Sequence, residues 1–153
     1  MKSKLKVYLD TSVISAYFDE RNPERKTLTL EFFKMQHDFS FYISEITIAE
    51  LNLTPNLELK NKMIELTNGI TVLKIGNEDQ ELSNDYVDHG AIPGNFAEDA
   101  LHIACAVLNN MDYLVSWNFK HIVKIKTKNI VKMVNTIRKL TDISIITPAE
   151  LLD

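Results

Sequence analysis

The sequence predicts an α/β protein in which a parallel sheet of about five strands is flanked by helices on both faces. Five short segments rich in β-branched and aromatic residues alternate with seven segments whose apolar residues recur at helical spacing. The segments between successive strands are long enough for crossover helices, which parallel strands require. With 153 residues, 45% of them hydrophobic and 25% charged, the chain has the length and composition of one globular domain.

Strands and helices follow one another in a regular order. Pro23 and Pro55 stand where helices can begin, since proline suits the first helical turn, and Pro93 with Gly94 marks a loop before another helix. In chain order the expected elements are strand 5–9, helices 12–18 and 23–37, strand 39–44, helices 46–53 and 55–68, strand 70–75, helices 78–89 and 96–110, strand 113–116, helix 128–140 and strand 143–147.

The composition excludes several classes of protein. Uninterrupted apolar stretches are only a few residues long, far below the roughly 20 needed to cross a bilayer, so no membrane association is expected. The N-terminus reaches Asp10 before an apolar signal segment can form, and we therefore expect a cytoplasmic protein. The single cysteine, Cys105, leaves no internal disulfide or cysteine-based zinc cluster, and the four glycines form no phosphate-binding loop.

Charge is distributed unevenly along the chain, whose net charge is -4. Residues 113–141 contain seven basic residues and no acidic one, whereas the rest of the chain carries 10 basic and 21 acidic residues. Such a division can place a site built from acidic residues beside a basic surface that attracts anions. A solvated helix face with ordinary lysines would give the same pattern.

Polar side chains follow the expected strands at their carboxyl ends, where open parallel sheets gather their functional groups. Asp10 ends the first strand, and Ser116 and Asn118 end the fourth. Glu50 lies on the helix after the second strand, and Asp99 lies near the start of the helix before the fourth. The sequence therefore predicts a functional site at this edge of the sheet.

Taken singly, these carboxylates also have structural interpretations. Asp10 could cap the helix that follows it, by accepting hydrogen bonds from backbone N–H groups. Glu50 borders an apolar stripe of its helix, and a carboxylate there requires a cation or hydrogen-bond donors. On a helical projection Asp99 lies at the edge of the apolar arc and Glu98 on the opposite side, so we expect Asp99 to face the sheet and Glu98 the solvent. The helix dipole alone would also favour an acidic residue in this first turn.

Taken together, the three carboxylates favour a metal ion. At a separation of about 5 Å and an effective dielectric constant near 20, each pair would repel by about 3 kcal/mol. Mg²⁺ and Mn²⁺, which prefer oxygen ligands, would compensate this repulsion and still bind waters and phosphate oxygens.

Four segments around these residues have a recognisable order and spacing. They are YLDTSVISAYF around Asp10, SEITIAEL around Glu50, EDALHIACA around Asp99 and LVSWNFKHI around Asn118. In this order they resemble PIN-domain proteins, particularly the VapC-type ribonuclease toxins of prokaryotic toxin–antitoxin pairs. The resemblance covers nearly the whole chain and implies a single PIN-like domain over residues 1–153.

The resemblance implies a ribonuclease that depends on Mg²⁺ or Mn²⁺. By position, Asp10, Glu50 and Asp99 match the family's metal-binding and catalytic carboxylates, and Ser12 matches a hydroxyl that supports the first of them. Ser116, at the end of the fourth strand, is expected to support the same site.

One position departs from the family pattern. Many members have an aspartate as a fourth acidic residue where this chain has Asn118, whose amide oxygen can bind a metal ion but contributes no charge. This substitution bears on whether one or two ions bind. One divalent ion with three carboxylates leaves one negative charge, whereas two ions leave one positive charge.

Several further expectations concern the substrate and partners. Single-stranded RNA is expected from the family resemblance, with phosphate contacts from Lys120, His121 and Lys124. Trp117 could stack on a base or pack in the core. The resemblance also implies an antitoxin protein as partner, and the apolar residues of the Phe32–Phe33 helix and of segment 57–64 could serve either the core or a homodimer face.

Three alternatives remain at the level of sequence. A zinc site could use Asp99, His102 and His121, although spacing fixes no third strong ligand. A phosphotransfer enzyme of the haloacid-dehalogenase type also begins with an aspartate after a first strand, but it requires a second aspartate where this chain has Ser12. A non-catalytic module that binds RNA or a partner protein is suggested by Asn118.

Overall fold

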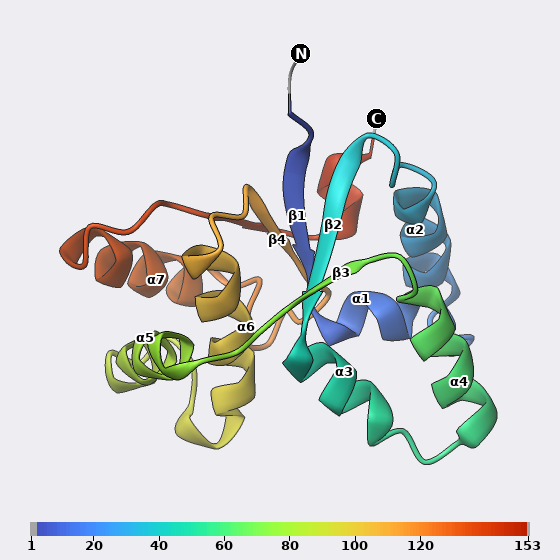
Figure 1. Ribbon diagram of the computed structural model, residues 1–153, viewed down its shortest axis with the longest axis horizontal. Coiled ribbons are helices and arrows are strands. Elements are labelled where there is room, and N and C mark those ends of the chain that lie inside the picture. Colours follow the sequence, from blue (N-terminus) through green and yellow to red (C-terminus); the bar gives the residue numbers. More distant parts are fainter. Residues whose placement is uncertain (1–2, 153) are drawn as a thin grey trace.

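The computed structural model describes residues 3–152, and its centre is a five-stranded sheet with the strand order β3-β2-β1-β4-β5 (Figure 1). All four pairs of neighbouring strands are parallel. The strands are β1 (Leu5–Leu9), β2 (Phe39–Ser44), β3 (Thr71–Leu73), β4 (Tyr113–Val115) and β5 (Ser144–Ile146).

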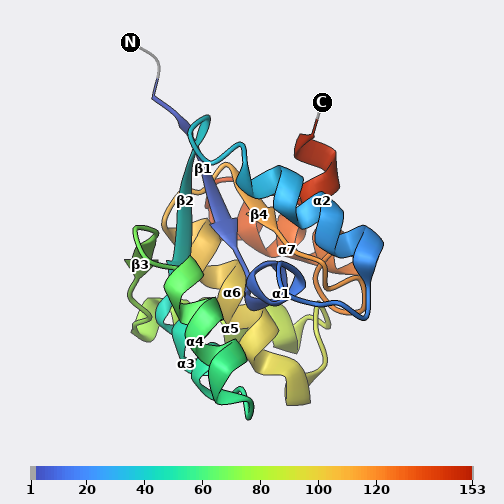
Figure 2. The same cartoon turned by 90° about the vertical axis from the view of Figure 1, so that its right-hand side faces the viewer.

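Helices cover both faces of the sheet. In Figure 1, α5, α6 and α7 lie on one side of the strands and α1 to α4 on the other, and Figure 2 views the second group from its own side. The helices are α1 (Thr11–Ala16), α2 (Pro23–Phe33), α3 (Glu45–Asn52), α4 (Leu57–Leu66), α5 (Asn77–Asp88), α6 (Ala97–Leu108) and α7 (Ile125–Ile137), with short 3-10 turns at η1 (Gly94–Phe96) and η2 (Pro148–Leu151).

The core has two parts because the central strand is buried on both faces. Side chains of a strand alternate between its faces, so Val7 and Leu9 pack with α1, α2 and α4, whereas Tyr8 packs with α5 and α6. The predicted fold class is confirmed: the protein has an α/β domain with a five-stranded parallel sheet between two layers of helices.

The bounds of the elements differ from the predicted ones mainly at helix ends. Strands 5–9 and 39–44 are confirmed as predicted, and the other three are shorter. Helix α7 begins at Ile125 rather than at residue 128, and it ends at Ile137 because Lys139 adopts a left-handed conformation, with φ of 58°. The N–H of Leu140 then bonds back to the carbonyl of Asn135 at 2.8 Å, which closes the helix end.

The parallel arrangement gathers the ends of β1, β2 and β4 at one edge of the sheet. Asp10 and Ser116 follow neighbouring strands, and the N–H of Asp10 bonds to the carbonyl of Val115 at 3.2 Å. Ser44, at the end of β2, caps α3 by accepting a hydrogen bond from the N–H of Ile46. Within residues 3–152, no helix combines the length and apolar character that a membrane crossing would need.

Candidate active site

Asp10 is buried at the end of β1, where two serine hydroxyls hold its carboxylate. Its Oδ1 accepts a hydrogen bond from Ser12 at 2.5 Å, and its Oδ2 accepts one from Ser116 at 2.6 Å. Asp10 occupies the position before α1, but its side chain makes no capping bond, so the interpretation of this carboxylate as a helix cap is wrong. Burial raises the pKa of Asp10, although His102 and the two hydroxyls act in the opposite direction.

Backbone N–H groups hold the two serines in turn. The Oγ of Ser12 accepts a hydrogen bond from the N–H of Trp117 at 2.9 Å, and the Oγ of Ser116 accepts one from the N–H of Asn118 at 2.9 Å. The segment after β4 is thereby tied to the start of α1. The orientation of the Asp10 carboxylate follows from these contacts between two parts of the chain about one hundred residues apart.

Glu50 is held by a chain of buried polar groups. Its Oε1 accepts hydrogen bonds from the Thr11 hydroxyl at 2.8 Å and from Nε2 of His102 at 2.6 Å. The other ring nitrogen of His102 lies 2.6 Å from the Tyr8 hydroxyl, which donates its hydrogen to Ser44 at 2.8 Å.

The surroundings of His102 favour its charged form. In that form Nδ1 donates to the Tyr8 hydroxyl, which donates to Ser44, while Nε2 donates to the Glu50 carboxylate. Burial disfavours the charged ring, but Glu50, Asp10 and Asp99 outweigh this effect and raise the pKa of His102. Burial likewise disfavours ionised Glu50, but His102 and Thr11 prevail and lower its pKa. The carboxylates thus favour the protonated form of this buried ring.

Asp99 lies in a third group of contacts, with the loop after β4. Its Oδ2 lies 3.3 Å from the Asn118 side-chain amide nitrogen, which donates to it, and 3.1 Å from Nδ1 of His121. The Asn118 Oδ1 accepts a hydrogen bond from the N–H of His121 at 2.9 Å. Burial raises the pKa of Asp99, with a smaller contribution from the charge of Glu50 and opposition from His102 and His121. Glu98 is exposed, as the helical projection predicted.

Each carboxylate thus faces its own protein donors. In the part of the chain that the structure describes, no three acidic, histidine or cysteine side chains converge closely enough to make a ready metal site. Even so, Oε2 of Glu50 and Oδ1 of Asp99 accept no hydrogen bond from residues 3–152. Carboxylate oxygens are the ligands that Mg²⁺ and Mn²⁺ prefer, so the chemistry of these side chains fits such an ion.

The structure separates the predicted site residues into distinct places. Asp10, Ser12 and Ser116 form one hydrogen-bonded group, and Asp99 and Asn118 form another with His121. The three predicted phosphate contacts, Lys120, His121 and Lys124, line one cavity next to Asp99.

The roles of Trp117 and His102 were only partly predicted from the sequence. The packing alternative for Trp117 is the one observed, because Trp117 is buried and its Nε1 donates to Thr29 at 2.9 Å. His102 entered only as a zinc ligand, yet both of its ring nitrogens are engaged by Tyr8 and Glu50, so the zinc alternative has no support here. The available signal for His102 was its position one helical turn after Asp99.

Two solved structures are similar to this one in fold. The VapBC2 crystal structure from Rickettsia felis, bound to a DNA fragment from the promoter, has a TM-score of 0.59 and 14% identity, over 94% of this chain and 98% of that one. The sarcin-ricin-loop-cleaving toxin VapC20 from Mycobacterium tuberculosis has a TM-score of 0.54 and 13% identity, over 75% and 92% of the two chains. No curated protein sequence matches this chain. Residues 7–120 match the family model for the PIN domain, and the chain therefore belongs to the PIN-domain family.

Proposed function

We propose that this protein is a ribonuclease that depends on Mg²⁺ or Mn²⁺ and hydrolyses phosphodiester bonds in RNA. PIN domains are typically nucleases and generally bind divalent metal ions. The observation that carries the proposal is the charge balance at the sheet edge. Asp10, Glu50 and Asp99 lie there beside the buried ring of His102, whose protonated form they favour, and with that ring charged one divalent ion would balance the remaining negative charge.

The protein residues would have separate roles in this reaction. Asp10, Glu50 and Asp99 would bind the ion, with Asn118 as a fourth, uncharged ligand, while Ser12 and Ser116 orient Asp10. When bound, the ion activates a water molecule and polarises the phosphodiester.

Asp99 is the better candidate to accept the proton of the attacking water. The Glu50 carboxylate is paired with His102, which lowers its pKa, whereas burial raises the pKa of Asp99 and so makes it the stronger base of the two.

A toxin–antitoxin setting completes the proposal. One structural neighbour is a VapBC2 assembly and another is a toxin that cleaves the sarcin-ricin loop. We infer that this chain acts in the cytoplasm as the toxin of such a pair, that an antitoxin protein inhibits it, and that the chain forms a homodimer.

The first prediction is a strict requirement for a divalent ion. RNA cleavage should be present with Mn²⁺ or Mg²⁺, weak with the larger and less strictly coordinated Ca²⁺, and absent in EDTA. Cleavage of labelled single-stranded RNA is measured with each ion, and circular dichroism in EDTA checks that the fold persists. Full activity in a rigorously metal-free preparation would overturn the site assignment.

The second prediction concerns Asn118→Asp. The new carboxylate would face Asp99, so an ion bound between them would gain a charged ligand, and Mn²⁺ affinity should rise about tenfold or more. Calorimetric titration of wild type and variant with Mn²⁺, without RNA, measures the change. Unchanged affinity would eliminate Asn118 as a ligand and leave its observed role, bridging Asp99 and the N–H of His121.

The second candidate function is an RNA- or partner-binding module without catalysis. It is favoured by the amide of Asn118, which donates to Asp99 where many relatives have an acid. Such a module would bind RNA but leave it intact in Mn²⁺ under conditions in which a nuclease degrades it.

A further inference from the structure

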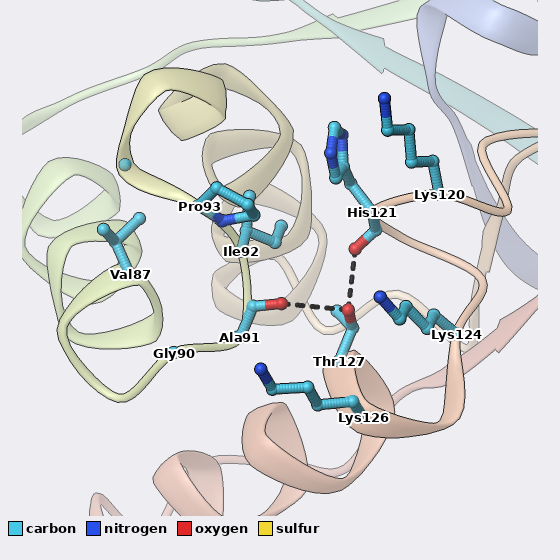
Figure 3. A pocket seen from close by; sticks show the side chains of 11 residues that line it. Val87, Gly90, Ala91, Ile92, Pro93, Lys120, His121, Lys124, Lys126 and Thr127 are labelled. Atoms are coloured by element: carbon cyan, nitrogen blue, oxygen red, sulfur yellow. Dashed lines mark hydrogen bonds between the residues drawn. The ribbon is translucent and has the colours of Figure 1, made fainter.

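A cavity of about 450 Å³ opens beside His121 (Figure 3). One wall is the loop 90–94 with Val87 at the end of α5, and the other is formed by residues of the segment 120–127. The volume is within the range of small-molecule sites. None of the residues that line it carries a negative charge.

The walls of the cavity are held in place by one buried hydroxyl. The Thr127 Oγ1 lies 2.9 Å from the carbonyl oxygen of Ala91 and 2.7 Å from that of His121, and these contacts join the two walls. Thr127 is 1% exposed, so water does not compete for these bonds. Gly90 has φ of +84°, a conformation that suits glycine and lets the loop turn back after α5. The cavity is therefore a fixed feature of the fold.

Three lysines surround the cavity without acidic partners. Lys120, Lys124 and Lys126 line it, and within residues 3–152 none of them has a carboxylate within 4.0 Å. Figure 3 shows Lys124 and Lys126 on the side of the cavity that faces Ala91, and Lys120 beside the ring of His121. Three unpaired ammonium groups in a protein of net charge -4 make this place attractive to an anion.

His121 connects the cavity to the carboxylates. Its Nδ1 contacts Asp99 at 3.1 Å, while its ring lies against that of Phe96, with centroids 4.1 Å apart. Phe96 is 40% exposed, so an aromatic surface extends from the cavity to solvent. The exposed Pro93 adds apolar surface to the opposite wall, against which a sugar or base could lie.

We propose that this cavity is a subsite for the RNA nucleotide next to the cleaved bond, with Lys124 and Lys126 binding its phosphate. The proposal rests on the ribonuclease function, because it takes the ligand to be the strand whose neighbouring phosphodiester lies at the carboxylates. The RNA strand would pass over His121 and Phe96. By binding a phosphate of the strand, the lysines would fix which phosphodiester lies at the carboxylates.

The test compares two pairs of neutralised lysines. Lys124→Gln with Lys126→Gln removes the charges at the cavity, and Lys132→Gln with Lys139→Gln removes two exposed charges from the later part of the same basic segment. Fluorescence anisotropy with a labelled short oligouridylate, in EDTA, gives the dissociation constant of each protein over a series of salt concentrations. We expect the cavity pair to weaken binding about tenfold and to lower the salt slope by about 0.7, as the loss of one phosphate contact predicts, with the control pair within about twofold of wild type.

A second measurement separates this subsite from the proposed function. Bis(p-nitrophenyl) phosphate with Mn²⁺ is a small diester that needs no neighbouring nucleotide, so the cavity pair should slow RNA cleavage several-fold more than it slows hydrolysis of this diester. The subsite proposal would be overturned if both lysine pairs weakened RNA binding equally, or if the cavity pair left RNA binding unchanged. If wild type cleaves neither RNA nor the small diester, the ribonuclease function fails, and the anisotropy comparison still decides whether the cavity binds the strand.

Discussion

Replacing Asp10 or Asp99 with asparagine is expected to remove most RNA cleavage without weakening the fold. Each change deletes a charged metal ligand, and we expect activity to fall by about 100-fold or more. Both carboxylates have pKa values raised by burial, so at neutral pH the folded state holds each as an unfavourable charge that the amide removes. Cleavage assays with Mn²⁺ and thermal unfolding in EDTA measure the two effects.

The neighbouring Glu98→Gln variant is the matched control. Glu98 occupies the next position on α6 but is exposed and contacts none of the site residues that the structure describes, so cleavage should be unchanged. The assignment would be wrong if Glu98→Gln abolished cleavage while Asp99→Asn merely unfolded the protein. A less stable Asp10→Asn variant would indicate that the hydrogen bonds this carboxylate accepts from Ser12 and Ser116 stabilise the fold more than its charge destabilises it.

Replacing His102 with alanine is expected to lower the free energy of unfolding by about 3–5 kcal/mol. The change leaves the Glu50 carboxylate half-buried without its cation, and it removes the partner of the buried Tyr8 hydroxyl. It also removes a ring that packs in the core with 2% exposure. Urea denaturation in EDTA measures the loss, without a contribution from bound metal ions.

A double variant distinguishes the ion pair from simple packing. Glu50→Gln together with His102→Gln removes both charges, so it should cost clearly less than the sum of the two single changes. His37→Ala, at an exposed histidine, is the control and should change stability by no more than about 0.5 kcal/mol. Additive costs for Glu50→Gln and His102→Gln would contradict a coupled buried pair.

The fold class could be predicted from the sequence, because hydrophobic periodicity and the order of the elements along the chain carry that information locally. The first two strands were predicted to the residue, and the orientation of Asp99 relative to Glu98 followed from the angle between successive helical positions. The carboxyl ends of parallel strands meet at one edge, so the region of the site followed from strand direction alone. The helix ends were predicted less accurately. Helix α7, for example, ends where Lys139 adopts a left-handed conformation, which no residue pattern indicates.

The tertiary structure decided which partner each carboxylate has. Asp10 could cap a helix in any local analysis, and it binds Ser116 instead because β4 is the neighbour of β1 in the sheet. The pairing of Glu50 with His102, and the cavity between loop 90–94 and segment 120–127, likewise depend on packing between α3, α6 and α7 and the loops beside them. Local pattern fixes which face a side chain presents, but a hydrogen bond also needs a second group from a distant part of the chain, and only the packed fold brings that group within reach.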